Sequence, residues 1–191
     1  TPVQGGTRVA AHIAPRSILT LNWSEQSGPG SRAAPLLAAQ VEIAMEVDAE
    51  SVLVRSSWAI TCSRGVAQSL QIRLAPDEDV SRIQLNDQSP APASGIESAE
   101  GANLLTIQLA EPLRAGESRR LVLETQRPLA EDGGLKFSGY PLKDAGEQTG
   151  YLGAVNGPDL FLDVRDAQRL RRIDPRDLPT ALKSRPGTTL A

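Results

Sequence analysis

Apolar and polar residues alternate along residues 40–74, and this pattern constrains the fold more than any other feature of the chain. Successive side chains of a β-strand point to opposite faces, so alternation gives each strand one apolar face and one polar face. The apolar series is Val41, Ile43, Met45 and Val47, then Val52, Val54, Trp58, Ile60 and Cys62, and finally Leu70, Ile72 and Leu74. The pattern predicts three consecutive strands in an antiparallel meander with one buried face.

Shorter segments on both sides of this stretch also read as strands. We expect them at residues 8–13, 17–23, 80–85, 104–109, 119–125 and 135–140. Between them, Gly, Pro, Ser and Asp mark loops or turns at residues 24–35, 76–79, 88–95, 112–117 and 132–134. Many short strands separated by such turns are typical of a β-sandwich. The predicted fold class is therefore all-β and mainly antiparallel, with two stacked sheets.

The composition changes near Pro128, where we expect the sandwich to end. Apolar runs at 150–155 and 160–164 flank an Asn-Gly-Pro-Asp sequence, which predicts a β-hairpin. We expect a short helix at 166–173 and one helical turn at 174–177, with Asp174 as its N-cap and Pro179 as its stop. The expected organisation is a flexible segment 1–15, a β-sandwich 16–128, a β-rich extension 129–183 packed on the sandwich, and a loose tail 184–191.

The composition argues against several classes of protein. The 191 residues are enough to bury a core, and the net charge of −3 is spread over mixed charges without the basic face of a nucleic-acid binder. Two Trp, two Tyr and two Phe leave few rings for stacking on bases or sugars. The single cysteine excludes an internal disulfide, and no apolar run reaches the ~18 residues of a membrane-spanning helix. Because the chain starts at Thr1 without Met or a signal core, we interpret it as part of a longer or processed polypeptide.

Residue types that commonly carry catalysis are scarce. His12 is the only histidine, which excludes a histidine-rich zinc site and the His-Glu-x-x-His motif. A Cys–His nucleophile pair would need Cys62 and His12, but Cys62 shares the inward parity of Trp58 and Ile60. A thiol buried in apolar surroundings is inert. Gly-x-Ser-x-Gly and phosphate-binding glycine motifs do not occur. We therefore predict no catalytic, cofactor-binding or metal-binding residue.

The remaining clusters have structural interpretations that we favour over functional ones. The acidic sequence at 77–79 offers oxygen ligands for calcium but lacks the spaced acids of an EF-hand, so we predict a solvated turn. The glycines within 146–153 lie between predicted strands, whereas a phosphate cradle needs a strand-to-helix turn. We predict a salt-bridged surface rather than an anion site for the basic cluster, and core positions for both tryptophans. The basic cluster consists of Arg169, Arg171 and Arg172, and Asp166, Asp174 and Asp177 are its acidic partners. The two tryptophans are Trp23 and Trp58.

Two resemblances to known families cover much of the chain. The strand rhythm of residues 40–128, with Leu-Gln-Ile-Arg-Leu-Ala-Pro-Asp-Glu-Asp-Val and Leu-Thr-Ile-Gln-Leu-Ala-Glu-Pro-Leu-Arg-Ala-Gly-Glu, resembles a common bacterial extracytoplasmic β-domain. It is similar, more weakly, to the N-terminal β-domain of gluzincin aminopeptidases, whose zinc-binding helical domain has no matching residues here. The segment from Gly150 through Leu-Arg-Arg-Ile-Asp-Pro-Arg-Asp-Leu-Pro resembles a stretch of large multi-domain envelope proteins of bacteria.

The favoured hypothesis is a non-catalytic structural or protein-interaction module of a larger extracytoplasmic protein, which is periplasmic, secreted or at the cell surface. Its expected partner is a protein or a component of the cell envelope, with no nucleic acid, no membrane span and no cofactor. Two alternatives stay open. One is an accessory substrate-binding domain of a peptidase or other hydrolase whose catalytic domain lies outside this chain. The other is a carbohydrate-binding module, which the low aromatic content disfavours.

Overall fold

A computed structural model describes most of the chain from residue 34 onward. The described residues are 2–3, 6–7, 34–86, 94–99, 101–130, 133–156, 161, 163, 170–171, 173–183 and 188–189. The chain divides into two compact units, Thr1–Gly30 and Ser31–Ala191. In the first unit, β1 (Pro2–Val3) pairs antiparallel with β2 (Gly6–Thr7). The predicted strands at 8–13 and 17–23 lie outside the described residues.

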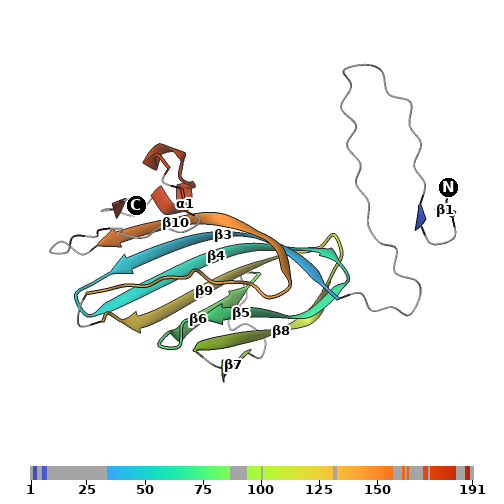
Figure 1. The fold of residues 1–191 in the computed structure, drawn as a ribbon, viewed down its shortest axis with the longest axis horizontal. Helices are drawn as coiled ribbons and strands as arrows, with labels where there is room; N and C mark the ends of the chain where they lie inside the picture. Colours follow the sequence, from blue (N-terminus) through green and yellow to red (C-terminus); the bar gives the residue numbers. More distant parts are fainter. Residues whose placement is uncertain are drawn as a thin grey trace, which may run out of the picture. The chain divides into compact units, whose positions relative to one another are not determined.

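The second unit contains a six-stranded sheet, which we call the large sheet (Figure 1). Its strands, in spatial order, are β11 (Thr188–Thr189), β10 (Ala145–Asn156), β3 (Leu36–Val47), β4 (Ser51–Arg64), β9 (Ser118–Pro128) and β6 (Asp79–Leu85). β10 runs parallel to β3, and the other neighbours are antiparallel. A Cβ atom at Gly150 would clash with the carbonyl oxygen of Val41, so glycine permits the close approach of β10 to β3.

A three-stranded sheet, the small sheet, is built from β5 (Val66–Leu74), β8 (Ala102–Arg114) and β7 (Ser94–Ala99). The predicted meander is wrong in its third strand, because β4 pairs with β3 and β9 while β5 pairs with β8. A single residue, Gly65 with φ of 75°, connects β4 to β5. A two-residue loop joins strands in a tight hairpin, so this connection is too short for β5 to fold back on β4. The chain crosses to the other sheet instead.

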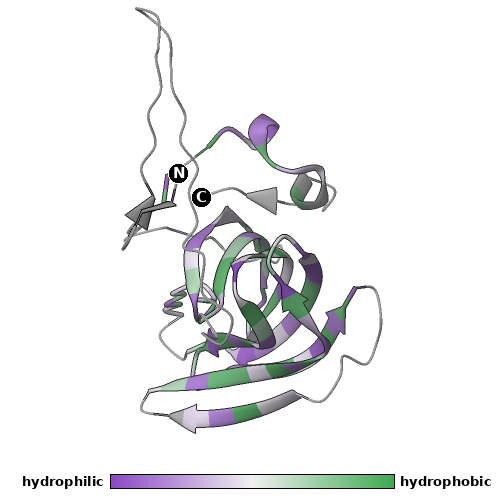
Figure 2. Cartoon of the chain, turned by 90° about the vertical axis from the view of Figure 1, so that its right-hand side faces the viewer, coloured by the Kyte–Doolittle hydropathy of each residue, from purple (hydrophilic) through white to green (hydrophobic). Residues whose placement is uncertain are grey.

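The inner faces of the two sheets enclose one apolar core, which confirms the predicted all-β sandwich. The apolar residues of the alternating stretch are buried in this core. β8 contributes Leu105 and Ile107 to it, and β9 contributes Leu121 and Leu123. Figure 2 shows the corresponding alternation of hydrophobic and hydrophilic residues along the strands. The inward-facing Ser56 is buried as well, where its hydroxyl accepts a 2.9 Å hydrogen bond from the Trp58 indole.

The C-terminal extension differs from its prediction in several places. Residues 133–141 run without regular secondary structure where a strand was predicted at 135–140. β10 pairs with β3 and, at Ala154 and Val155, with β11. Of the predicted second hairpin strand 160–164, the described residues 161 and 163 are not in a strand, and the rest lies outside the described residues. Of the predicted helix 166–173, the described residues 170, 171 and 173 are not helical, and the rest is outside the described residues.

The helical turn predicted at 174–177 is confirmed. The 3₁₀ helix η1 (Pro175–Asp177) forms at the predicted turn, where the Asp174 carboxylate accepts a 2.8 Å bond from the Arg176 amide. After Pro179 comes α1 (Thr180–Lys183), and Leu178 and Leu182 pack on Ala44. This segment therefore covers part of the outer face of the large sheet. None of the helices in the described residues has the length and apolarity to cross a membrane.

Candidate functional site

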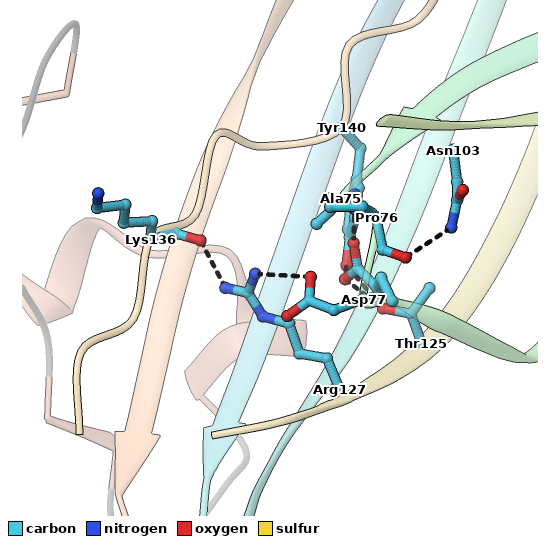
Figure 3. A network of polar contacts seen from close by, with 9 residues as sticks. Ala75, Pro76, Asp77, Asn103, Thr125, Arg127, Lys136 and Tyr140 are labelled. Atoms are coloured by element: carbon cyan, nitrogen blue, oxygen red, sulfur yellow. Dashed lines mark hydrogen bonds and ion pairs between the residues drawn. The ribbon is translucent and has the colours of Figure 1, made fainter. Parts of the chain in front are cut away.

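Two polar regions stand out in the second unit, and the first is a buried polar cluster at the turn between β5 and β6. The Glu78 carboxylate accepts hydrogen bonds from the Thr125 hydroxyl at 2.7 Å, from the Tyr140 phenol, and from the Ala75 amide at 3.1 Å. The Thr125 and Tyr140 hydroxyl oxygens also lie 2.7 Å apart, so either hydroxyl can donate to the other in place of Glu78 (Figure 3). All three side chains are buried, so the solvated acidic turn predicted at 77–79 is wrong for Glu78.

Burial is the main reason that the pKa of Tyr140 is raised above its usual range, and the hydrogen bond with Glu78 raises it further. The phenol thus stays protonated and serves as a hydrogen-bond donor. Phe137 packs its ring edge-on against Tyr140, with 5.3 Å between the ring centroids. The residues around Tyr140 therefore hold a neutral hydroxyl in place, and they do not prepare it to act as a base.

Arg127 extends the cluster toward solvent. Its guanidinium donates a 2.6 Å hydrogen bond to the Lys136 carbonyl and lies 3.9 Å from the exposed Asp77 carboxylate. The side chain is otherwise enclosed, and its Nε atom has no hydrogen-bond partner among the described residues. Together the four side chains Glu78, Thr125, Arg127 and Tyr140 connect the β5–β6 turn, β9 and the segment before β10. We call them the buried polar cluster, and their arrangement fits a structural role.

The second polar region is a depression on the outer face of the large sheet, across β10, β3, β4 and β9. It consists of two adjoining hollows of about 500 and 260 Å³ that share Gln40 and Ala59, and we call it the outer-face hollow. The residues lining it are Ala38, Ala39, Gln40, Glu42, Ser57, Trp58, Ala59, Thr61, Asn86, Ser118, Arg119, Arg120, Glu147 and Thr149. Short side chains at Ala38 and Ala59 keep its floor close to the backbone.

The charges around the outer-face hollow are divided between its two sides. Glu147 and Glu42 lie on the β10–β3 side, whereas Arg120 lies on the β9 side. The neighbouring Arg119 shares the inward parity of Leu121 and pairs with Glu111 and Glu117. Two hydroxyl groups of the hollow, those of Thr61 and Ser118, form a hydrogen bond with each other at 2.8 Å. The hollow therefore presents acidic groups on one side and a basic group on the other.

The structure places the other sequence-predicted residues as follows. Cys62 is fully buried, with its sulfur 3.2 Å from the Arg64 carbonyl, and Trp58 is buried in the core, as predicted. His12, Trp23, Asp166, Arg169 and Arg172 lie outside the described residues. Arg171, Asp174 and Asp177 are exposed, and the glycines of 146–153 lie in β10. No group of three or more His, Cys, Asp or Glu side chains is placed to hold a metal ion in the part of the chain that the structure describes.

The fold and these two polar regions define a β-sandwich without a recognisable catalytic centre among the described residues. No protein-family model matches the chain, and no curated protein matches it in sequence. In solved structures, an M1 zinc metallopeptidase from Deinococcus radiodurans is 17% identical over 49% of this chain, with a TM-score of 0.39. A mutant of an M1 zinc metallopeptidase from the same organism, bound to a Tyr-Ser-Ala substrate, is 19% identical over 53% of this chain, with a TM-score of 0.40.

A two-domain M1 zinc metallopeptidase mutant bound to L-arginine is 15% identical over 69% of this chain, with a TM-score of 0.46. The chain spans 21%, 23% and 37% of the lengths of these three structures. These structural neighbours are M1 zinc metallopeptidases, at low identity and over part of the chain. The resemblance to multi-domain envelope proteins stays a prediction.

Proposed function

We propose that this chain is a non-catalytic interaction module of a larger protein, and that the outer-face hollow receives another protein or domain. The hollow supports this because it is open, lies outside the core and carries groups that form hydrogen bonds. Specific protein interfaces bury roughly 800 Å² on each partner, and a broad sheet face provides such an area. The proposed partner is a folded protein surface that carries both acidic and basic side chains.

The division of charge is the reason to favour a protein partner. A basic group of the partner would face Glu42 and Glu147, and an acidic group would face Arg120. Complementary charges of this kind fix the orientation of a partner more than they raise its affinity. A carbohydrate partner is disfavoured because Trp58, the aromatic residue that lines the hollow, is buried and offers no ring for stacking.

Cysteine labelling tests this proposal. Ala59 is exposed in the hollow, whereas the native Cys62 is buried, so a maleimide added to the Ala59→Cys variant reports on position 59. We expect rapid labelling of the isolated chain and labelling at least tenfold slower in the full-length parent or with its partner bound. Gln68→Cys, exposed on β5 of the small sheet, is the matched control and should label equally in both. Equal rates at position 59 in every form would show that the hollow is not an interface.

A second candidate is an accessory domain that forms one wall of a substrate site in a hydrolase. The same division of charge favours it, because a short peptide has an ammonium group for the glutamates and a carboxylate for Arg120. Titration with free tripeptides separates the two candidates. Saturable changes in the NMR shifts of the Gln40 and Ala59 amides would support the accessory domain. No such change would favour the protein-interaction module.

We also propose that the parent protein is exported from the cytoplasm. The basis is the resemblance of residues 40–128 to extracytoplasmic β-domains. Alkaline phosphatase, which is active only after export, can be fused behind the chain in the full-length gene. Active phosphatase is the expected result, and a fusion that is expressed but inactive would contradict export.

A further inference from the structure

Strand β7 lies at one edge of the small sheet as far as the structure describes it. Its residues Ser94–Ala99 pair antiparallel with residues 102–107 of β8, and no described strand pairs with its second edge. Alternate residues of an antiparallel strand turn their N–H and C=O groups away from the neighbour, so part of the β7 backbone faces outward. Edges of this kind are templates for the addition of another extended segment.

The opposite edge of the same sheet shows what such an addition looks like. There the chain's own segment at 141–143 lies beside β5. The Arg73 amide donates to the Pro141 carbonyl at 3.0 Å, and the Lys143 amide donates to the Gln71 carbonyl at 2.8 Å. The small sheet therefore already binds a short extended segment along one edge through backbone hydrogen bonds.

A row of apolar side chains crosses the sheet from the covered edge to the β7 edge. Leu142 pairs with Ile72, Ile72 with Leu105, and Leu105 with Ile96. Leu142 is 5% exposed, but Ile96, at the other end of this row, is 47% exposed. An added strand with an apolar side chain opposite Ile96 would continue the row and cover that exposed surface.

The neighbouring row, on the other face of the sheet, ends in a charge. Arg73 pairs with Leu104, and Leu104 pairs with Glu97. No described side chain forms an ion pair with the exposed Glu97. A basic side chain placed opposite Glu97 would be favourable, while an acidic one would be repelled.

From these two rows we infer that β7 binds an extended peptide by antiparallel strand addition, with an apolar residue opposite Ile96 and a basic residue opposite Glu97. In an antiparallel pair the basic residue comes directly before the apolar one in the peptide. This site lies on the small sheet, away from the strands that form the outer-face hollow, so it goes beyond the proposed function and can fail without it.

A second copy of the chain is a less suitable occupant. If two β7 strands paired antiparallel with Ile96 opposite Ile96, each Glu97 would lie opposite Gly95. Moving the register by one residue in either direction places Ile96 opposite Glu97 or Gly95. None of these arrangements gives both an apolar neighbour to Ile96 and a basic neighbour to Glu97.

The test is a titration of the full chain with the peptide acetyl-Thr-Thr-Lys-Val-Thr-Thr-amide, followed by NMR of backbone amides. We expect saturable shifts at Ile96 and Glu97. Glu97→Lys should weaken binding about two- to fivefold, and a peptide with Glu in place of Lys should then bind this variant more tightly than it binds the wild type. Ile96→Thr should also weaken binding, and both side chains are exposed, so the fold should tolerate these changes.

Glu111→Lys is the matched control, because it makes the same charge change on β8 outside the β7 register, at a residue that is 89% exposed in its side chain. It should leave the affinity unchanged. The inference would be overturned by no saturable shift at millimolar peptide or by equal affinity of the wild type for the Lys and Glu peptides. Shifts confined to β6, the edge strand of the large sheet, would overturn it as well. Concentration-dependent dimerisation with shifts at β7 would assign the edge to a second copy and would also overturn it.

Discussion

The buried polar cluster and the outer-face hollow contain similar residue types in opposite surroundings. In the cluster, Glu78 accepts three hydrogen bonds and is enclosed together with Thr125 and Tyr140. In the hollow, Glu42 and Glu147 border an open depression. Polar groups that are buried must be paired within the protein, whereas those at the surface are paired by water and can exchange it for a partner. Burial thus separates residues that hold the fold from residues available for recognition.

The largest loss of stability is expected from a substitution of Glu78. Glu78→Ala removes the acceptor for the Thr125 and Tyr140 hydroxyls and for the Ala75 amide. Because those donors stay enclosed, we expect a loss of about 3 kcal/mol in the free energy of unfolding. Glu42→Ala in the hollow should change it by less than about 0.5 kcal/mol. Urea denaturation of both variants measures this, and similar losses would mean that the two regions do not differ in their role.

Tyr140→Phe tests the same contrast with a smaller change. The ring and its edge-on contact with Phe137 are kept, but the hydroxyl bonds to Glu78 and Thr125 are lost. We expect a loss of about 1–2 kcal/mol in the free energy of unfolding, because a buried acceptor loses one donor. Ser57→Ala, its counterpart in the hollow, should be neutral within about 0.5 kcal/mol. A neutral Tyr140→Phe would show that the phenol bonds contribute no net stability.

Alkaline pH should weaken the cluster and leave the hollow intact. The folded-state pKa of Tyr140 is raised, chiefly by burial, so above the ordinary tyrosine value of about 10 the unfolded chain releases a proton that the folded protein keeps. This stabilisation is complete below about pH 10 and is lost progressively as the pH rises toward the folded-state pKa, by at most about 1.4 kcal/mol per pH unit. Urea midpoints of wild type and Tyr140→Phe between pH 8 and 11 measure it, and parallel curves would contradict it.

The sandwich was predictable because alternation reports directly which side of a strand is buried. The apolar series of β3 and β4 is buried as expected, and Thr125 shares the inward parity of Leu121 and Leu123 in β9. Alternation does not show which strands are neighbours. The crossing at Gly65 and the parallel pairing of β10 with β3 depend on connection length and on contacts between distant segments.

The two polar regions could not be predicted, because they too depend on which distant segments are neighbours. Glu78 lies in an acidic turn beside the exposed Asp77 and Asp79, and its burial depends on Thr125 and Tyr140, 47 and 62 residues away. The outward direction of Ala59 follows from the parity of β4. Its position beside Gln40, over a shallow floor, depends on the pairing of β3 with β4.

The smallest effect on stability, and the sharpest on recognition, is expected where the hollow is filled. Ala59→Tyr places a ring on an exposed position of the outer face, so the free energy of unfolding should change by less than about 0.5 kcal/mol. The same ring occupies the space that a partner would enter and should weaken binding of the partner or parent domain at least tenfold by calorimetry. Leu53→Tyr, also exposed on β4 but outside the hollow, should not. If both variants bind equally well, the hollow is only a shallow feature of a twisted sheet, and polar residues on this surface serve solubility rather than recognition.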